Sequence, residues 1–238
     1  MDTLFGNRPI KLSALSDFSQ LSTETKKHLK NVYTCLMITM ASAGVGAYMN
    51  LKMQFGQGGL LTALVSIGLM IWLATTAHNK ENQMKRLAIL SAFGFTTGIG
   101  LGPLINLTIQ INPQIVVTAF MTTSVIFACF TLAALYAQRR SLLYLGGICG
   151  SGLTMLLFAS LLNIFVGSTL LFQANLYIGI AIFSGFILYD TQLIVEKHVN
   201  GDNDYIWHSV DLFLDFINLF RRIMILLASN ENKNKRKD

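Results

Sequence analysis

Seven long apolar stretches constrain this chain more than any other feature of its sequence. About 20 apolar residues in a helix are needed to cross the roughly 30 Å of hydrocarbon in a bilayer. The stretches of this kind lie near residues 31–51, 56–77, 87–109, 114–137, 141–162, 174–196 and 205–228. Only 13% of the residues are charged, whereas soluble domains carry about 25%. The sequence therefore predicts an all-α integral membrane protein with seven helices.

The connections between the stretches are short, which predicts one membrane domain over residues 31–228. A polar segment, 1–30, precedes this domain, and a basic tail, 229–238, follows it. Lys and Arg residues gather in the N-terminal segment and in every second connection, and only Lys52 lies in the other connections. Because basic loops stay in the cytosol, the N-terminus is expected there. The net charge of +6 lies in these segments, so no nucleic-acid-binding surface is expected.

The basic tail conflicts with this topology, because seven complete crossings would place it on the side opposite the N-terminus. Its basic residues include Lys233, Lys235, Arg236 and Lys237. Either the seventh segment crosses because its surroundings hold it there, or it is re-entrant. A re-entrant segment is tolerated where it packs in protein or lines water.

The last stretch, HSVDLFLDFINLFRR, carries polar residues at spacings of three and four. On a helix, His208, Asp211, Asp215, Asn218 and Arg222 form one stripe. A charged side chain at the centre of a bilayer costs at least about 2.5–3.5 kcal/mol. The stripe should therefore face a bundle interior or a water-filled path. This predicts a central last helix with the other six around it.

Asp190, in FSGFILYDTQLIVEK, adds a third acid to the sixth stretch. The loop HVNGDND, with its turn at Asn200-Gly201, predicts that the sixth and seventh helices are antiparallel neighbours. Asp190 could then meet Asp211 or Asp215, and the estimated depths slightly favour Asp211. His208, one turn away, either tunes these acids or is an interfacial polar residue.

Two carboxylates that meet in a medium of low dielectric tend to share a proton. The shared proton holds the helices together, whereas full ionisation separates them and attracts a divalent cation such as Ca²⁺. This reasoning predicts a cation pathway gated by protonation, with a weak Ca²⁺ site at whichever two acids form the pair. The alternative is that the acids are structural hydrogen-bonding groups between helices.

Glycines and histidines give further expectations. Gly94, Gly98 and Gly102 follow one another at spacing four, which predicts close helix packing. Pro103 should kink or end that helix. Gly146 and Gly150 repeat the same spacing. The four histidines are dispersed along the sequence with no metal-binding spacing, and there is no phosphate-binding loop. We therefore expect no resident cofactor and no enzymatic activity.

The motifs quoted above from the sixth and seventh stretches resemble the C-terminal part of proteins of the transmembrane Bax inhibitor motif family. FTTGIGLGP in the third stretch and TAFMTTSVIFACFTLAALYAQRRSLLYLGG extend the resemblance over nearly the whole chain. The resemblance is strongest to the endoplasmic-reticulum member of the family. It implies a last helix between two layers of three helices and a pH-sensitive Ca²⁺ leak across that membrane. It also implies that the acid pair is Asp190 with Asp215 rather than Asp211.

The resemblance further implies suppression of stress-induced apoptosis and modulation of the unfolded protein response. The implied partners are proteins of the Bcl class and the sensor nuclease of that response. The tail residues Lys233, Lys235, Arg236 and Lys237 are implied in pH response or partner contact. The chain departs from the family at Asp211, often a non-acidic position. Some relatives have a basic residue in the second helix that can pair with the acid of the sixth. This chain has no Lys or Arg in 56–77, so that ion pair cannot be carried over.

The sequence thus favours a Ca²⁺ channel or Ca²⁺/H⁺ exchanger. A non-conducting scaffold that binds the sensor nuclease and Bcl-class proteins stays open as an alternative. An intramembrane aspartyl protease would also place two acids on adjacent helices, but its GxGD sequence is absent around Asp215. A homo-oligomer stays open too.

Overall fold

Helices form nearly all of the part of the chain that the computed structural model describes, which is residues 21–53, 59–138 and 140–235. No strand occurs in these ranges. The helices are α1 (Thr23–Met53), α2 (Leu60–Thr75), a short 3₁₀ helix η2 (Lys80–Asn82), α3 (Gln83–Ile111), α4 (Gln114–Tyr136), α5 (Leu145–Val166), α6 (Thr169–Val199) and α7 (Tyr205–Asn234). By length and apolar composition α1, α3, α4, α5 and α6 can each cross a membrane. The predicted seven-helix, all-α membrane protein is confirmed.

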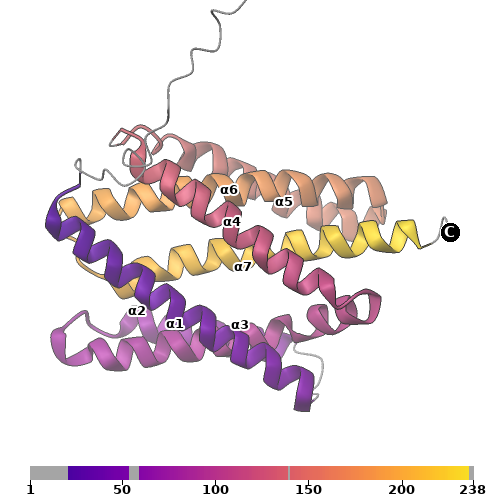
Figure 1. The fold of residues 1–238 in the computed structure, drawn as a ribbon, viewed down its shortest axis with the longest axis horizontal. Coiled ribbons are helices and arrows are strands. Elements are labelled where there is room, and N and C mark those ends of the chain that lie inside the picture. The colour runs from indigo at the N-terminus through magenta and orange to yellow at the C-terminus, as the bar shows by residue number, and fades with distance from the viewer. Residues whose placement is uncertain (1–20, 54–58, 139, 236–238) are drawn as a thin grey trace, which may run out of the picture.

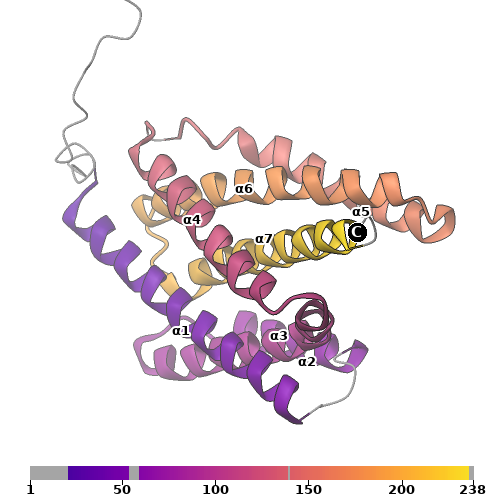
Figure 2. The ribbon, with the colours of Figure 1, turned by 45° about the vertical axis from the view of Figure 1, so that its right-hand side comes forward.

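The last helix lies between two layers of three helices (Figures 1 and 2). Helices α1, α2 and α3 form one layer and α4, α5 and α6 form the other. Helix α7 contacts α1, α3, α4 and α6, whereas in the described ranges α2 contacts the other α-helices only at α3, and α5 only at α6. The central position of α7 is therefore confirmed. Four helices surround it rather than six, because α2 and α5 lie on the outer flanks.

Aromatic side chains attach α7 to both layers. The ring of Phe213 meets that of Phe93 in α3 with centroids 5.7 Å apart. The ring of Phe216 meets Phe120 and Phe127 of α4 at 5.9 and 5.6 Å. All these pairs meet edge to face, the geometry that aromatic quadrupoles favour. The apolar side of α7 thus forms the centre of the bundle.

Glycines bring α1 and α3 into close contact, as their spacing predicts. A Cβ atom on Gly98 would collide with the carbonyl oxygen of Ala43, and one on Gly94 with Thr39. In α5, Gly146 lies against Tyr189, but nothing lies within 4 Å of a Cβ built on Gly150, so the repeated spacing marks only one contact there. Helix α3 continues past Pro103 to Ile111. Of the two expectations for Pro103, a kink or an end of the helix, the second is wrong, since helices packed in membranes tolerate proline.

Several helix bounds differ from the hydropathy pattern. Helix α1 begins at Thr23 rather than near 31, because the Ser22 hydroxyl accepts the Thr25 N–H at 3.1 Å. Helix α6 likewise begins at Thr169, after its cap Ser168, and extends to Val199. Helix α2 is shorter than expected, and helix α5 is shifted by four residues toward the C-terminus.

Helix α7 is one unbroken helix, and its two ends lie at opposite ends of the bundle (Figure 1). Near its end, the Lys235 ammonium donates to the carbonyl oxygen of Ile111 at 2.7 Å. The Asn112 amide donates to Glu231 at 3.3 Å. The re-entrant alternative is therefore wrong, and Glu231 and Lys235, in the described part of the tail, lie beside the α3–α4 connection. Two of its predicted regulatory residues, Arg236 and Lys237, lie outside the described residues.

Candidate functional site

The carboxyl groups of Asp190 and Asp215 face each other across the contact between α6 and α7, within hydrogen-bonding range. Asp215 is 5% exposed and Asp190 is half-buried. The Oδ2 atom of Asp215 accepts no hydrogen bond from a donor group in the described part of the chain. Among the described residues neither carboxyl makes an ion pair. A hydrogen bond between two carboxyl groups requires one of them to hold a proton. Two carboxyl groups in this arrangement can share one proton.

Asp211 lies one turn of α7 before this pair, on the side of the α6–α7 turn. Its Oδ2 atom is 3.9 Å from the Lys197 ammonium, and the two side chains are 31% and 33% exposed. It is close enough to act electrostatically on both Asp190 and Asp215. The structure thus brings the three predicted acids together. The pair is Asp190 with Asp215, so the depth estimate that favoured Asp211 is wrong.

The other residues of the polar stripe have separate partners. The Asn218 amide donates to the Leu214 carbonyl of its own helix at 2.9 Å. Arg222 donates to the carbonyl and side-chain oxygens of Asn175 in α6 at 3.0 and 3.1 Å. The predicted stripe faces protein, as expected, but its members do not form one network.

Three histidines far apart in the sequence gather where α1, α6 and α7 meet. His28 and His198 stack with ring centroids 4.3 Å apart. The Nε2 atom of His28 is 3.0 Å from the Nδ1 atom of His208, and the two residues are separated by 180 positions. His208 is completely buried, and its Nε2 atom is 3.4 Å from an Asp202 oxygen. His208 therefore contacts this cluster rather than the acids one turn away. Sequence analysis missed the cluster because no local spacing encodes it.

Asp204 completes the charged end of the bundle. Its carboxylate accepts a hydrogen bond from Arg86 at 2.6 Å and from the Trp207 N–H at 3.1 Å, which caps α7. His78, the fourth histidine, is 3.5 Å from the same carboxylate. In the adjoining turn, burial opposes ionisation of Asp202, but the Asp204 N–H and His208 outweigh it and lower its pKa. Each acid here has a positive or hydrogen-bonding partner.

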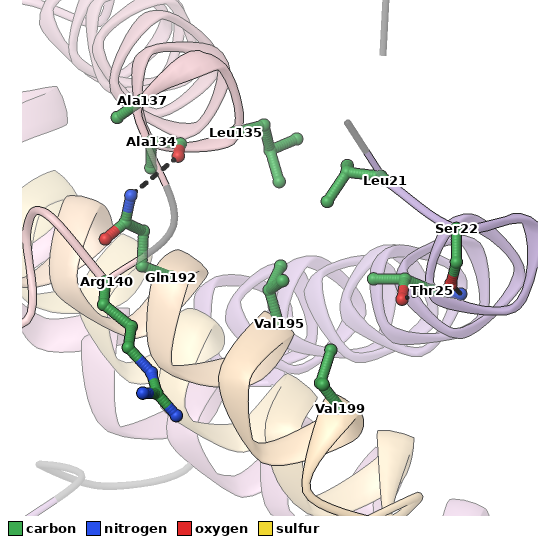
Figure 3. Close-up of a pocket in the computed structure, with 10 residues that line it drawn as sticks. All are labelled: Leu21, Ser22, Thr25, Ala134, Leu135, Ala137, Arg140, Gln192, Val195 and Val199. Atoms are coloured by element: carbon green, nitrogen blue, oxygen red, sulfur yellow. Dashed lines mark hydrogen bonds between the residues drawn. The ribbon is translucent and has the colours of Figure 1, made fainter. Parts of the chain in front are cut away.

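A cavity of about 330 Å³ lies at the same end, between the start of α1 and the ends of α4 and α6 (Figure 3). The Gln192 amide points from α6 toward α4 and donates to the Ala134 carbonyl at 3.3 Å. Its oxygen accepts the Leu142 N–H at 2.8 Å. Arg140 pairs with Glu196. These contacts fix the α4–α5 connection to α6, and no aspartate lines the cavity.

Comparisons with known proteins agree with this architecture. A family model described as "Inhibitor of apoptosis-promoting Bax1" matches residues 25–232. Bax inhibitor 1 of Bos taurus is 54% identical over 97% of this chain and 98% of its own length. Bax inhibitor 1 of Homo sapiens is 53% identical over 98% of both chains. Bax inhibitor 1 of Arabidopsis thaliana is 41% identical over 96% of this chain and 92% of its own length. With its helices able to cross a membrane several times, the chain belongs to the Bax inhibitor family.

Proposed function

We propose that this protein inhibits apoptosis, as the names of its relatives state of them, by acting as a proton-regulated Ca²⁺ leak pathway in the endoplasmic-reticulum membrane. The pathway is a channel or a Ca²⁺/H⁺ exchanger. The observation that carries the proposal is the pair Asp190 and Asp215, which meets inside a helical membrane domain without an ion pair to any described residue. Such acids are costly in a membrane, and neutral amides would join the helices equally well.

The proton decides the state of the pair. With one shared proton, the carboxyl groups hydrogen-bond and hold α6 against α7. Without it, two negative charges repel each other at short range in a medium of low dielectric. The same two charges attract a hard divalent cation, which carboxylate oxygens bind readily. We therefore expect Ca²⁺ flux to rise as the pH rises through the loss of this proton.

Charged groups of increasing exposure connect the pair to the α6–α7 turn. Asp215 is 5% exposed, whereas Asp211 and Lys197 are about one-third exposed at 31% and 33%, and Asp202 reaches 50%. In the described ranges no three His, Cys, Asp or Glu side chains are arranged as metal ligands. Two carboxylates without a third protein ligand suit an ion in transit better than an ion held permanently.

Reconstitution of the full chain in liposomes tests the proposal. Ca²⁺ release is measured with a fluorescent indicator while the pH is stepped across the neutral range. Asp190→Asn and Asp215→Asn should each remove most of the pH dependence, because an amide neither shares nor loses this proton. Glu81→Gln, at an exposed acid of η2, is the matched control and should behave as wild type. Wild-type flux in both aspartate variants refutes the mechanism.

The tail favours a second candidate function, a scaffold that binds Bcl-class proteins or the sensor nuclease of the unfolded protein response. The end of α7 projects beyond its neighbours (Figure 1) and exposes Lys233. Deletion of residues 230–238 separates the two candidates. Loss of cell protection with intact Ca²⁺ flux supports the scaffold, and loss of protection only in the aspartate variants supports the leak pathway.

A further inference from the structure

A second pocket, of about 440 Å³, lies between α5, α6 and α7 at the end of the bundle opposite the histidine cluster. At 1.5 Å per residue, Arg222 is about 25 Å along α7 from Tyr205. The pocket has six polar lining residues: Ser160, Asn163, Asn175, Asn218, Arg221 and Arg222. These are two guanidinium groups, three amides and one hydroxyl. No Asp or Glu of the described ranges lines the pocket, so the charge of its described lining is positive and unbalanced.

Arg222 is held in place by α6. It donates through Nη1 to both oxygens of Asn175 at 3.0 and 3.1 Å, and its guanidinium group lies 5.1 Å from the centre of the Phe183 ring. Gly179 provides the space, since a Cβ atom there would overlap the guanidinium group. The other guanidinium nitrogens of Arg222 make no hydrogen bond to the described residues. Those donors remain available to a ligand.

The amide of Asn175 is also fixed before any ligand arrives. Its Nδ2 atom donates to the Leu156 carbonyl at 3.0 Å and to the Ser160 hydroxyl at 2.9 Å, both in α5. This orientation turns its oxygen toward Arg222. One network therefore joins all three helices that form the pocket. Arg221, next in the lining, is exposed and makes no ion pair within the described ranges.

The surroundings of the pocket indicate its ligand. Planar guanidinium groups bind phosphate through paired hydrogen bonds, and no acid competes here. Near the α5–α6 connection, Ile164, Phe165 and Leu170 are 75%, 89% and 75% exposed, as expected where acyl chains cover a membrane protein. We propose that Arg221, Arg222 and the amides around them bind a phosphate group, supplied by a phospholipid headgroup or by a soluble phosphate ion.

Two binding measurements on the purified full chain test this site and distinguish the two sources. The first titrates inorganic phosphate against chloride at equal ionic strength and follows thermal unfolding in detergent. The second incorporates the chain into phosphatidylcholine nanodiscs with added phosphatidic acid and measures retained lipid by native mass spectrometry. Binding in both shows that phosphate alone suffices. Binding only of phosphatidic acid assigns the headgroup as the source. Binding in neither overturns the proposal.

Variants locate the binding within the pocket. Arg221→Gln should weaken it about tenfold, as expected for the loss of one charged hydrogen bond. Gly179→Ala should weaken it without any loss of charge, because the added methyl group displaces Arg222. Lys52→Gln, at the same end of the bundle but outside the pocket, is the control and should bind as wild type. Equal losses in Arg221→Gln and Lys52→Gln would show that only net charge matters, which also overturns the proposal.

Discussion

Asp204 and Asp215 belong to the same helix, one as its cap and one in its interior, but their surroundings are opposite. The Asp204 carboxylate meets Arg86 at 2.6 Å and His78 at 3.5 Å, and it caps α7. Among the described residues Asp215 faces only acids, Asp190 and, one turn away, Asp211, and its Oδ2 atom accepts no hydrogen bond from them. The first charge is neutralised and supports the fold. The second is not, so its presence calls for a role other than stability. The partners of each acid, rather than its spacing along the helix, separate the two roles.

The largest expected effect on stability concerns Asp204, the acid whose charge is neutralised. Arg86 is 3% exposed, so Arg86→Gln leaves Asp204 without its main counter-charge. We expect the free energy of unfolding to fall by about 3 kcal/mol, at the low end for a broken buried pair because Asp204 keeps some exposure. Denaturant unfolding in detergent measures this. Lys85→Gln, at the exposed neighbour that lies over Trp72, should cost less than about 1 kcal/mol. Equal losses would contradict the structural role of Arg86.

Asp215→Asn should have the opposite outcome on stability. An amide at this position can donate the hydrogen bond that the shared proton makes, and it removes the cost of a buried charge, so the free energy of unfolding should stay within about 1 kcal/mol of wild type or rise. The same unfolding assay measures it, alongside the flux assay in liposomes. A loss as large as that of Arg86→Gln would mean that Asp215 is a structural group, and the comparison with Asp204 would fail.

Lys197→Gln tests the contribution of the positive charge that lies beside Asp211. The ion pair with Asp211 is long and one-third exposed, so its loss should change stability by less than about 0.5 kcal/mol. The positive charge of Lys197 favours ionisation of the nearby acids, and its removal makes them hold the proton to higher pH. The midpoint of the pH-dependent Ca²⁺ flux should therefore shift upward. A midpoint that stays fixed would show that Lys197 does not act on the acids.

Asp202→Asn should give the smallest effect. The pKa of Asp202 is lowered in the folded protein, so this acid contributes stability above its ordinary pKa, and the contribution is lost as the pH falls through the lowered value. Its side chain is 50% exposed, which limits the gain to less than about 0.5 kcal/mol after screening. The variant should unfold more easily than wild type near neutral pH and equally in acid. A difference that grows in acid would reverse the sign and contradict the prediction.

Much of the fold follows from local properties of the sequence. Long apolar stretches reveal the helices because each must satisfy its own backbone inside a membrane. The glycine spacing predicts close packing of Gly98 against another helix, which in the structure is α1, since only a residue without a side chain allows such an approach. The short loop with its turn at Asn200-Gly201 predicts that α6 and α7 are neighbours. In the structure Gly201 has a φ of +98°, which glycine adopts readily. That pairing in turn brings Asp190 to Asp215.

Contacts between distant segments could not be predicted in this way. The start of α1 is polar, so hydropathy omits it, yet His28 in its second turn is buried against His198 and His208. The outer positions of α2 and α5 could not be predicted from hydropathy either, because every helix in a membrane bundle is apolar on its outside as well. The pocket around Arg222 depends on Gly179, a glycine outside any repeated spacing.

The shortness of α2 has a consequence for the lipid around it. Its 16 residues extend about 24 Å at 1.5 Å per residue, less than the roughly 30 Å of an average hydrocarbon layer. It lies on an outer flank, where acyl chains rather than protein border it. A short helix at such a flank is matched by a thinner bilayer, by polar side chains at its ends that reach the interface, or by association with another protein. The α2 flank is therefore the side of the bundle where the thickness of the surrounding membrane should matter most.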